Sequence, residues 1–361
     1  MITTTQPWIG NRWTDILFIL MPPFFCLLFI ILFPAIFQNQ DGMSDAWWVL
    51  LILLIDVAHV YSTLYRTYFD PLAYKMHKNK LLVIPFVSFV AGVLLYSYNP
   101  LLFWRVLAYT AVFHFVRQQY GFMRIYSRKE NSSRFFSIID SITIYTATIY
   151  PLLFWHLKAD RKFNWFVEGD FLKVNATADL LTICTTLYYL VLIIYCIKEI
   201  IFSLKSNTIN LPRNVVVAGT TASWYIGIVY FNGDMAFTLL NVVSHGIPYM
   251  ALIWIYGKKS SNTIATPTSR LLQLVFSRYG LLLFLAIIFL LAFVEEGLWD
   301  ITLWKEHTVV FSIFNQGKIK LSEALLTMIV PMLALPQITH YIIDGFIWKV
   351  KKETVSGKDA L

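Results

Sequence analysis

Long apolar runs alternate with short polar connections along almost the whole chain. A helix that crosses the hydrocarbon core of a bilayer needs about 20 apolar residues. Runs that approach this length lie at 15–37, 46–68, 81–98, 101–122, 135–156, 179–203, 213–231, 235–256, 280–297 and 321–346. The alternation of a barrel strand is absent, and unpaired backbone cannot face lipid, so each run is predicted to be helical. The ninth run ends on Glu295 and Glu296, and we expect it to be short or interfacial.

Composition supports the same class of protein. Hydrophobic residues make up 58% of the 361 residues and charged residues 14%, which is too apolar for a soluble chain of this length. We therefore expect an all-α, polytopic integral membrane protein with about ten transmembrane helices, forming a single domain over residues 1–361. The three cysteines lie inside apolar runs without CxxC spacing, so the sequence indicates neither a disulfide framework nor a zinc knuckle.

The net charge of +8 indicates the orientation of the chain in the membrane rather than nucleic-acid binding, because Lys and Arg gather in short segments between the apolar runs. Each even-numbered run is followed by basic residues, the mark of a cytoplasmic edge: Lys75, Lys78 and Lys80; Arg124, Arg128, Lys129 and Arg134; Lys205 and Arg213; Lys258 and Lys259; Lys349, Lys351 and Lys352. Both termini are therefore predicted to be cytoplasmic, and the glycosylation sequon at Asn175 to lie outside. We expect the plasma membrane or a bacterial inner membrane.

Ionisable residues inside the spans are candidates for function, because they are costly to bury in a bilayer. They occur at helical spacing, so that those of one run share a face: Asp56, His59, Thr63 and Arg66; His114, Arg117 and Gln118; Asn241 and His245; Gln337, His340 and Asp344. Asp140, in the fifth run, either forms an ion pair with Arg117 or joins the same site.

The four histidines of these runs are predicted to share one layer of the cytoplasmic half. His114, His245 and His340 lie about 9 to 13 residues from the nearest basic edge, or about 13 to 20 Å at ~1.5 Å per residue. His59 lies at a similar depth if its helix runs to Arg66 and the chain beyond it lies on the interface. Imidazole is a common ligand for transition metals, and helical bundles build such sites from histidines and carboxylates at i, i+3 or i, i+4 spacing. The predicted metal ligands are His59, His114, His245, His340, Asp56 and Asp344. These six residues are enough to bind one or two transition-metal ions, and we expect iron.

Neighbouring polar residues would complete the site. Five polar side chains can hydrogen-bond the outer ring nitrogens of the predicted ligands: Asn241, Gln118, Gln337, Thr63 and Tyr341. Arg66 and Arg117 are too basic to bind metal and suit a carboxylate or phosphate. Arg117, Asn241 and Tyr341 are the residues expected to take part directly in catalysis.

Two loose resemblances bear on the reaction. Histidines in the cytoplasmic half of a helical membrane protein resemble the histidine-rich di-iron desaturases and hydroxylases, although the clustered HxxxH and HxxHH boxes of that family are absent. The segment SHGIPY at 244–249 is similar to a His-Gly-x-x-Pro segment of some membrane-bound O-acyltransferases, in which a membrane-embedded histidine acts near an asparagine. Neither assigns the chain to a family.

Three functions follow as hypotheses. The first is a metal-dependent membrane oxidoreductase, such as a desaturase, hydroxylase or oxygenase of lipid metabolism, acting on a lipid or other apolar substrate with an electron donor as partner. The second is an O-acyltransferase with His245 as general base. The third is a haem-binding protein or a proton-coupled transporter. Phosphate loops, dinucleotide fingerprints and GxSxG or HExxH motifs are absent, which argues against nucleotide-driven pumps and serine or zinc hydrolases.

Overall fold

Helices form all of the regular structure that the computed structural model describes, which covers residues 6–38, 43–158, 160–161, 164–174, 177–261, 269–314 and 321–348. The predicted all-α class is confirmed for this part of the chain. Contacts divide the chain into two compact units, each made of two segments. Unit 1 comprises Met1–Gly42 and Val112–Pro248, and unit 2 comprises Met43–Ala111 and Tyr249–Leu361.

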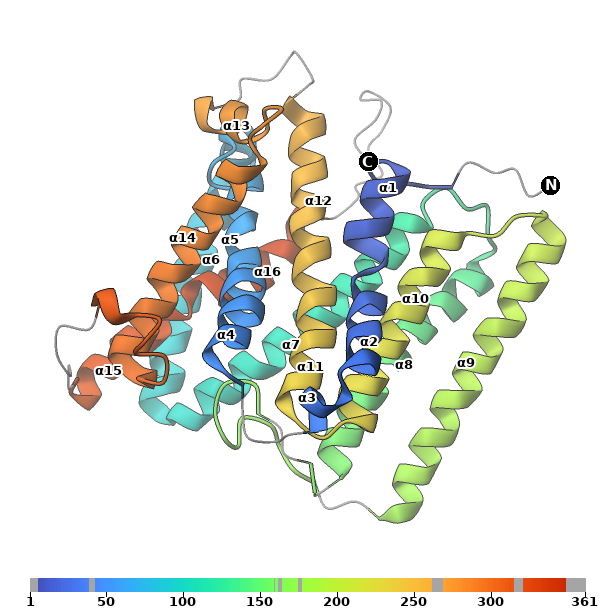
Figure 1. The fold of residues 1–361 in the computed structure, drawn as a ribbon, viewed down its shortest axis with the longest axis horizontal. Coiled ribbons are helices and arrows are strands. Elements are labelled where there is room, and N and C mark those ends of the chain that lie inside the picture. The colour runs from blue at the N-terminus through green and yellow to red at the C-terminus, as the bar shows by residue number, and fades with distance from the viewer. Residues whose placement is uncertain are drawn as a thin grey trace. The chain divides into compact units, whose positions relative to one another are not determined.

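Unit 1 packs α8, α9 and α10 beside one another (Figure 1). The starts of these helices follow from capping residues, because Ser133, Thr177 and Asn210 each accept a hydrogen bond from a backbone N–H of the first turn. The elements of this unit are α1 (Arg12–Asp15), η1 (Ile16–Leu20), α2 (Pro22–Leu32), α3 (Pro34–Gln38), α8 (Arg134–Leu157), α9 (Ala178–Ser206), α10 (Leu211–Trp224), η4 (Tyr225–Tyr230), α11 (Asp234–Phe237) and η5 (Thr238–Val242).

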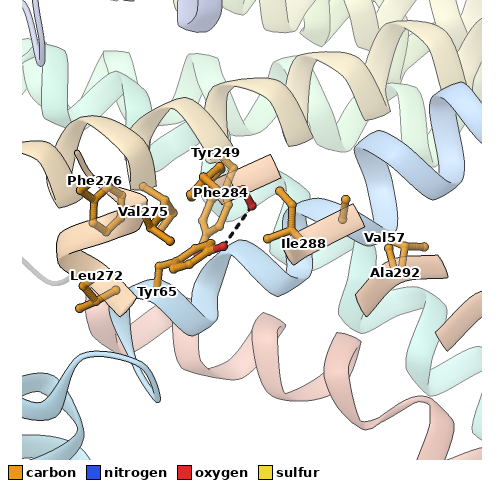
Figure 2. Packing of buried hydrophobic residues seen from close by; sticks show 11 residues of the cluster. Val57, Tyr65, Tyr249, Leu272, Val275, Phe276, Phe284, Ile288 and Ala292 are labelled. Carbon is orange, nitrogen blue, oxygen red and sulfur yellow. Dashed lines mark hydrogen bonds between the residues drawn. The ribbon is translucent and has the colours of Figure 1, made fainter. Parts of the chain in front are cut away.

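Unit 2 has a core in which aromatic rings from separate helices interlock (Figure 2). Tyr65 stacks on Phe284 with ring centroids 4.7 Å apart, and its hydroxyl donates to the carbonyl oxygen of Phe284 at 3.0 Å. The elements of this unit are α4 (Asp45–Trp48), η2 (Val49–Val57), α5 (Ala58–Ser62), η3 (Thr63–Arg66), α6 (Pro71–Tyr98), α13 (Arg270–Val275), α14 (Leu281–Trp299), η6 (Asp300–Trp304), η7 (Ser312–Phe314), α15 (Glu323–Leu333) and α16 (Leu335–Ile347).

Two helices, α7 (Pro100–Tyr126) and α12 (Val243–Ser261), contribute residues to both units. His114 lies on α7 and His245 on α12. The chain within α12 is continuous, so His245 and Tyr249 lie one helical turn apart on the same face.

Seven helices among the described residues are long and apolar enough to cross a membrane: Asp45–Arg66, Pro71–Tyr98, Arg134–Leu157, Ala178–Ser206, Asp234–Ser261, Leu281–Trp304 and Glu323–Ile347. The bent pair Arg12–Leu20 and Pro22–Leu32, which turns by 52°, would make eight as one span. These helices indicate a multi-pass membrane protein. The predicted total of ten is not confirmed, because the runs at 101–122 and 213–231 are helical without being among the seven.

Two details differ from the prediction. The helix over Leu281–Trp304 continues past Glu295 and Glu296, which are buried within it, so the expectation of a short ninth span is wrong. Lys75, Lys78 and Lys80 lie in the first turns of α6 rather than in a loop. Asn175, Lys349, Lys351 and Lys352 lie outside the described residues.

Candidate metal centre

His59 lies on α5, directly after the π-helical segment η2. Its side chain is 1% exposed. Nδ1 lies 3.2 Å from the carbonyl oxygen of Ile55, the distance at which a ring N–H donates to backbone. A proton on Nδ1 places the lone pair of the neutral ring on Nε2, which is then the nitrogen that a metal would bind.

His340 lies on α16, and a chain of hydrogen bonds holds its ring. Nδ1 lies 2.7 Å from Thr63 Oγ1, and this hydroxyl lies 2.9 Å from Tyr249 Oη. The Tyr249 hydroxyl donates in turn to Asp344 Oδ1, to which Trp348 Nε1 also donates at 3.2 Å. All of these groups are buried or partly buried.

The direction of this chain fixes the tautomer of His340. Because the Tyr249 hydroxyl donates to Asp344, its oxygen is left to accept from the Thr63 hydroxyl. The Thr63 oxygen then accepts from Nδ1–H of His340, so the lone pair lies on Nε2. His59 and His340, whose ring centroids are 5.0 Å apart, therefore have the same metal-binding nitrogen.

His114 and His245 form a second pair, from α7 and α12. Their exposed fractions are 4% and 0%, and their ring centroids are 5.0 Å apart. Phe115 stacks flat on the His245 ring, with centroids 3.6 Å apart and planes at 6°. Gln118 Nε2 donates to the carbonyl oxygen of His245 at 2.8 Å, which ties α7 to α12 beside the ring. Like His59, His245 closely follows a π-helical segment, here η5, and such segments are frequent at functional sites.

The four histidines form one group. One ring nitrogen from each of His59, His114, His245 and His340 lies within 4.8 Å of the others, and all four residues are buried. In an octahedral site with metal–nitrogen bonds of about 2.1 Å, neighbouring nitrogens are about 3.0 Å apart and opposite ones about 4.2 Å. The upper limit of the nitrogen–nitrogen distances in this group, 4.8 Å, is thus within about 1 Å of the spacing between opposite ligands that a bound metal requires. The predicted histidine cluster is present.

The two predicted carboxylate ligands lie beside this group rather than in it. Asp56 Oδ1 lies 3.8 Å from Nδ1 of His59, the nitrogen that faces the backbone. Asp344 Oδ1 accepts from Tyr249 and Trp348, at the far end of the chain that holds His340. Their positions suit residues that orient the imidazoles and balance a metal's charge.

The predicted catalytic residues occupy three different environments. Asn241 is buried, and its amide donates to the carbonyl oxygens of Phe237 and Ser223 at 3.2 and 3.4 Å. Arg117 is exposed and donates to the Tyr145 hydroxyl. Tyr341 is partly buried next to His340, with ring centroids 5.8 Å apart. Asn241 and Arg117 therefore hold neighbouring structure through these bonds, whereas Tyr341 lies against the ring of His340.

Sequence reasoning missed a network of buried charges in unit 1. Lys198 Nζ lies 2.5 Å from both Asp140 and Glu199. Arg213, 0% exposed, contacts Asp140, Glu199 and Glu130. Asp140 therefore pairs with Lys198 and Arg213, and the expected ion pair with Arg117 is wrong. The signal was present in Lys198 and Glu199, two adjacent charges inside the run at 179–203.

A buried carboxylate on α14 was also missed. Glu295, 4% exposed, accepts from the hydroxyl of Tyr61 at 2.5 Å, from Gln337 Nε2 and from Trp299 Nε1 at 3.4 Å. Gln337 was expected beside the histidines, yet its amide is bonded to this carboxylate. The sequence offered a signal in Glu295 itself, because an acid next to an apolar run is either at its end or paired inside it.

Comparison of the chain with protein-family models, with curated proteins and with solved structures finds no significant match. The function therefore has to be argued from the chemistry of the site.

Proposed function

We propose that this protein is a membrane-embedded, metal-dependent oxidoreductase that holds one non-haem iron ion with His59, His114, His245 and His340. The observation that carries the proposal is the approach of one nitrogen from each of four buried imidazoles to within 4.8 Å. Imidazole nitrogens are common ligands of transition metals, and helical bundles build metal sites from side chains on facing helices. Four imidazoles whose nitrogens lie this close together form a donor set of that kind.

The number of ligands favours iron without haem. A haem iron takes its in-plane ligands from the macrocycle and at most two from protein, whereas here one nitrogen from each of four imidazoles lies within 4.8 Å of the others. Zinc prefers four ligands in a tetrahedron, so four histidines would fill its shell and leave no position for a substrate. Six-coordinate iron bound by four imidazoles keeps two open positions, which redox chemistry with oxygen requires.

The surroundings support an apolar substrate. A partly open pocket in unit 1 is lined by Ser244 and Pro248, which flank His245 in the sequence of α12. Most of its other walls are aliphatic or aromatic, with Gln119, Thr220 and Ser223 as polar exceptions. This lining suits a lipid tail or another hydrocarbon chain that carries few polar groups. A desaturase or hydroxylase reaction would also draw electrons from a donor protein.

Elemental analysis combined with an optical spectrum tests the proposal. The purified full-length protein is expected to contain about one iron ion per chain and to show no Soret band. Each of the variants His59→Ala, His114→Ala, His245→Ala and His340→Ala should lower the iron content well below one. His156→Gln and His307→Gln are matched controls, because these histidines lie outside the group and should leave the iron in place.

Other results would point to other functions. A Soret band would show that the protein binds haem rather than non-haem iron. Protein that stays metal-free after reconstitution with ferrous iron would overturn the proposal, and turnover that depends on His245 but not on His59 or His340 would favour acyl transfer instead. Retention of iron by all four single variants would show that the histidines are not the ligands.

A further inference from the structure

A second polar cavity lies in unit 2, where two candidate membrane spans end. It is bordered by Arg66, the last residue of the span Asp45–Arg66, and by Ser260 and Ser261 at the end of the span Asp234–Ser261. It is open on one side, and the space of about 430 Å³ that these residues border includes part of the open solvent. Because both spans end here, the cavity lies at the level at which lipid headgroups meet the protein.

Arg66 is the anchor of this cavity. Its guanidinium carbon lies 3.6 Å from the centre of the Tyr256 ring and 3.9 Å from that of Trp348, so the group is held between two aromatic rings. Nη2 donates to the carbonyl oxygen of Ile347 at 2.9 Å, which fixes the plane of the group. A guanidinium fixed in this way is pre-organised to bind an anion.

One donor of Arg66 remains unused by protein. Nη1 is buried and has no hydrogen-bond partner among the residues that the structure describes. A buried donor of a charged group is costly to leave unsatisfied, so this nitrogen is where a ligand oxygen would bind. Phosphate and carboxylate oxygens match the guanidinium best, because the resulting hydrogen bonds are charge-assisted.

The opposite charge is also present at the cavity. Asp70 lines it and caps α6, with Oδ1 accepting from the backbone N–H groups of Leu72 and Ala73. The cap uses one carboxylate oxygen, and the negative charge disfavours a ligand that is purely anionic. A ligand carrying an anion and an ammonium group satisfies both residues.

The remaining walls are apolar. Tyr65, Leu272 and Phe276 line the cavity and belong to the buried core of unit 2 (Figure 2). Gly257 gives the Phe276 ring its place, since a Cβ at this position would lie 2.1 Å from that ring. An amphiphile bound at this open-sided cavity can therefore place its polar headgroup at Arg66 and Asp70 and rest apolar atoms against this wall.

We propose that this cavity binds the zwitterionic headgroup of an aminophospholipid, with the phosphate on Arg66 and the ammonium group on Asp70. The site is separate from the histidine group and needs no metal. Its occupant is a membrane lipid, either the substrate or a resident lipid that supports this end of the bundle.

Titration of the full-length, detergent-solubilised protein with short-chain lipids tests the proposal, with native mass spectrometry as the readout. Dihexanoylphosphatidylethanolamine is expected to bind with a saturable stoichiometry of one. Arg66→Gln should weaken its binding at least about tenfold, because a charge-assisted contact to phosphate is lost. Arg278→Gln, a change at an exposed arginine of the same unit, should leave binding unchanged.

Asp70→Asn separates the two charges of the ligand. Asparagine also caps helices, so α6 should stay intact. The variant should bind the ethanolamine lipid several-fold more weakly and should bind dihexanoylphosphatidylglycerol, which lacks the ammonium group, more tightly than the wild type does. Equal binding of both lipids by wild type and variant would overturn the zwitterion assignment.

Two further results would count against the site. Inorganic phosphate that competes as well as the lipid would show a free-anion site, and binding that survives Arg66→Gln would show that the lipid lies elsewhere. Iron content measured on the same samples should not change in any variant. A failure of the lipid proposal therefore leaves the metal proposal standing, and the reverse also holds.

Discussion

Two buried clusters of ionisable side chains differ in composition. The charge network of unit 1, made of Glu130, Asp140, Lys198, Glu199 and Arg213, joins two cations to three carboxylates. The histidine group brings together four side chains of one kind. The first cluster therefore contains ions of both signs, whereas the second is a set of like side chains that commonly bind metal.

The difference separates a structural cluster from a site. In the charge network the Lys198 and Arg213 contacts to Asp140, Glu199 and Glu130 balance cations against carboxylates, at 2.5 Å for Lys198 and at 2.7 and 3.4 Å for Arg213 with Glu130 and Asp140. The histidine group contains four imidazoles, a donor set that suits a transition-metal ion. Burial alone does not distinguish the two clusters, whereas the presence or absence of opposite charges among their side chains does.

The largest expected effect is on stability, from Lys198→Met. This change leaves three carboxylates, Glu130, Asp140 and Glu199, around Arg213 as their one remaining cation in the network, and this buried excess of negative charge should cost about 3–5 kcal/mol of unfolding free energy. Thermal unfolding of the purified protein, followed by circular dichroism, measures the loss. The iron content of the fraction that remains folded should be unchanged, because the change lies outside the histidine group.

A double variant is the control for that experiment. Adding Asp140→Asn removes one of the excess negative charges and should recover part of the lost stability. If Lys198→Met left the unfolding temperature in place but abolished turnover, the network would be a functional site, and the contrast between the two clusters would fail.

The second largest effect is expected from Thr63→Val, a change that tests how the ring of His340 is held in place. Thr63→Val keeps the shape of the side chain but removes the hydroxyl that accepts from His340 Nδ1. Loss of a partner that fixes a ligand's tautomer typically lowers metal affinity about 10–100-fold. Competition with a chelator of known iron affinity gives this change directly.

Thr67→Val is the matched control, because Thr67 is also buried and its hydroxyl donates to the carbonyl oxygen of Thr63 rather than to a histidine. Iron affinity should stay within about twofold of the wild type in this variant, since no ligand loses a partner. Equal losses in both variants would mean that Thr63 acts on the packing of this helix end and not on the tautomer of His340.

Much of the fold could be predicted, because backbone in a bilayer has to satisfy its hydrogen bonds within a helix. The start of α6 could also have been predicted, since Asp70 followed by Pro71 is a helix-start pattern, although the lysines that follow suggested a loop. The π-helical segments η2 and η5 could not be predicted, because they depend on how neighbouring helices pack.

The histidines of the site could be found from depth and spacing, but the roles of the carboxylates could not. Spacing places Asp344 on the face of His340, and in the structure its carboxylate turns to Tyr249 and Trp348. That choice depends on rotamers and on contacts between distant helices. Tyr249 gave a usable signal, because it lies four residues after His245 on one helix.

The smallest expected effect comes from Tyr249→Phe, which cuts the hydrogen-bond chain one step further from His340 than Thr63→Val does. Thr63 keeps its hydroxyl and can still accept from His340, but it loses the acceptor that orients it, and Asp344 keeps Trp348 as a donor. Iron affinity should therefore fall by only several-fold, less than in Thr63→Val, with a stability loss of about 1–2 kcal/mol for the missing buried hydrogen bonds. Chelator competition and thermal unfolding on the same preparation measure both quantities. A loss of affinity larger than that of Thr63→Val would show that Tyr249 acts on the metal by a route other than Thr63, and the order of the chain from Asp344 to His340 would have to be abandoned.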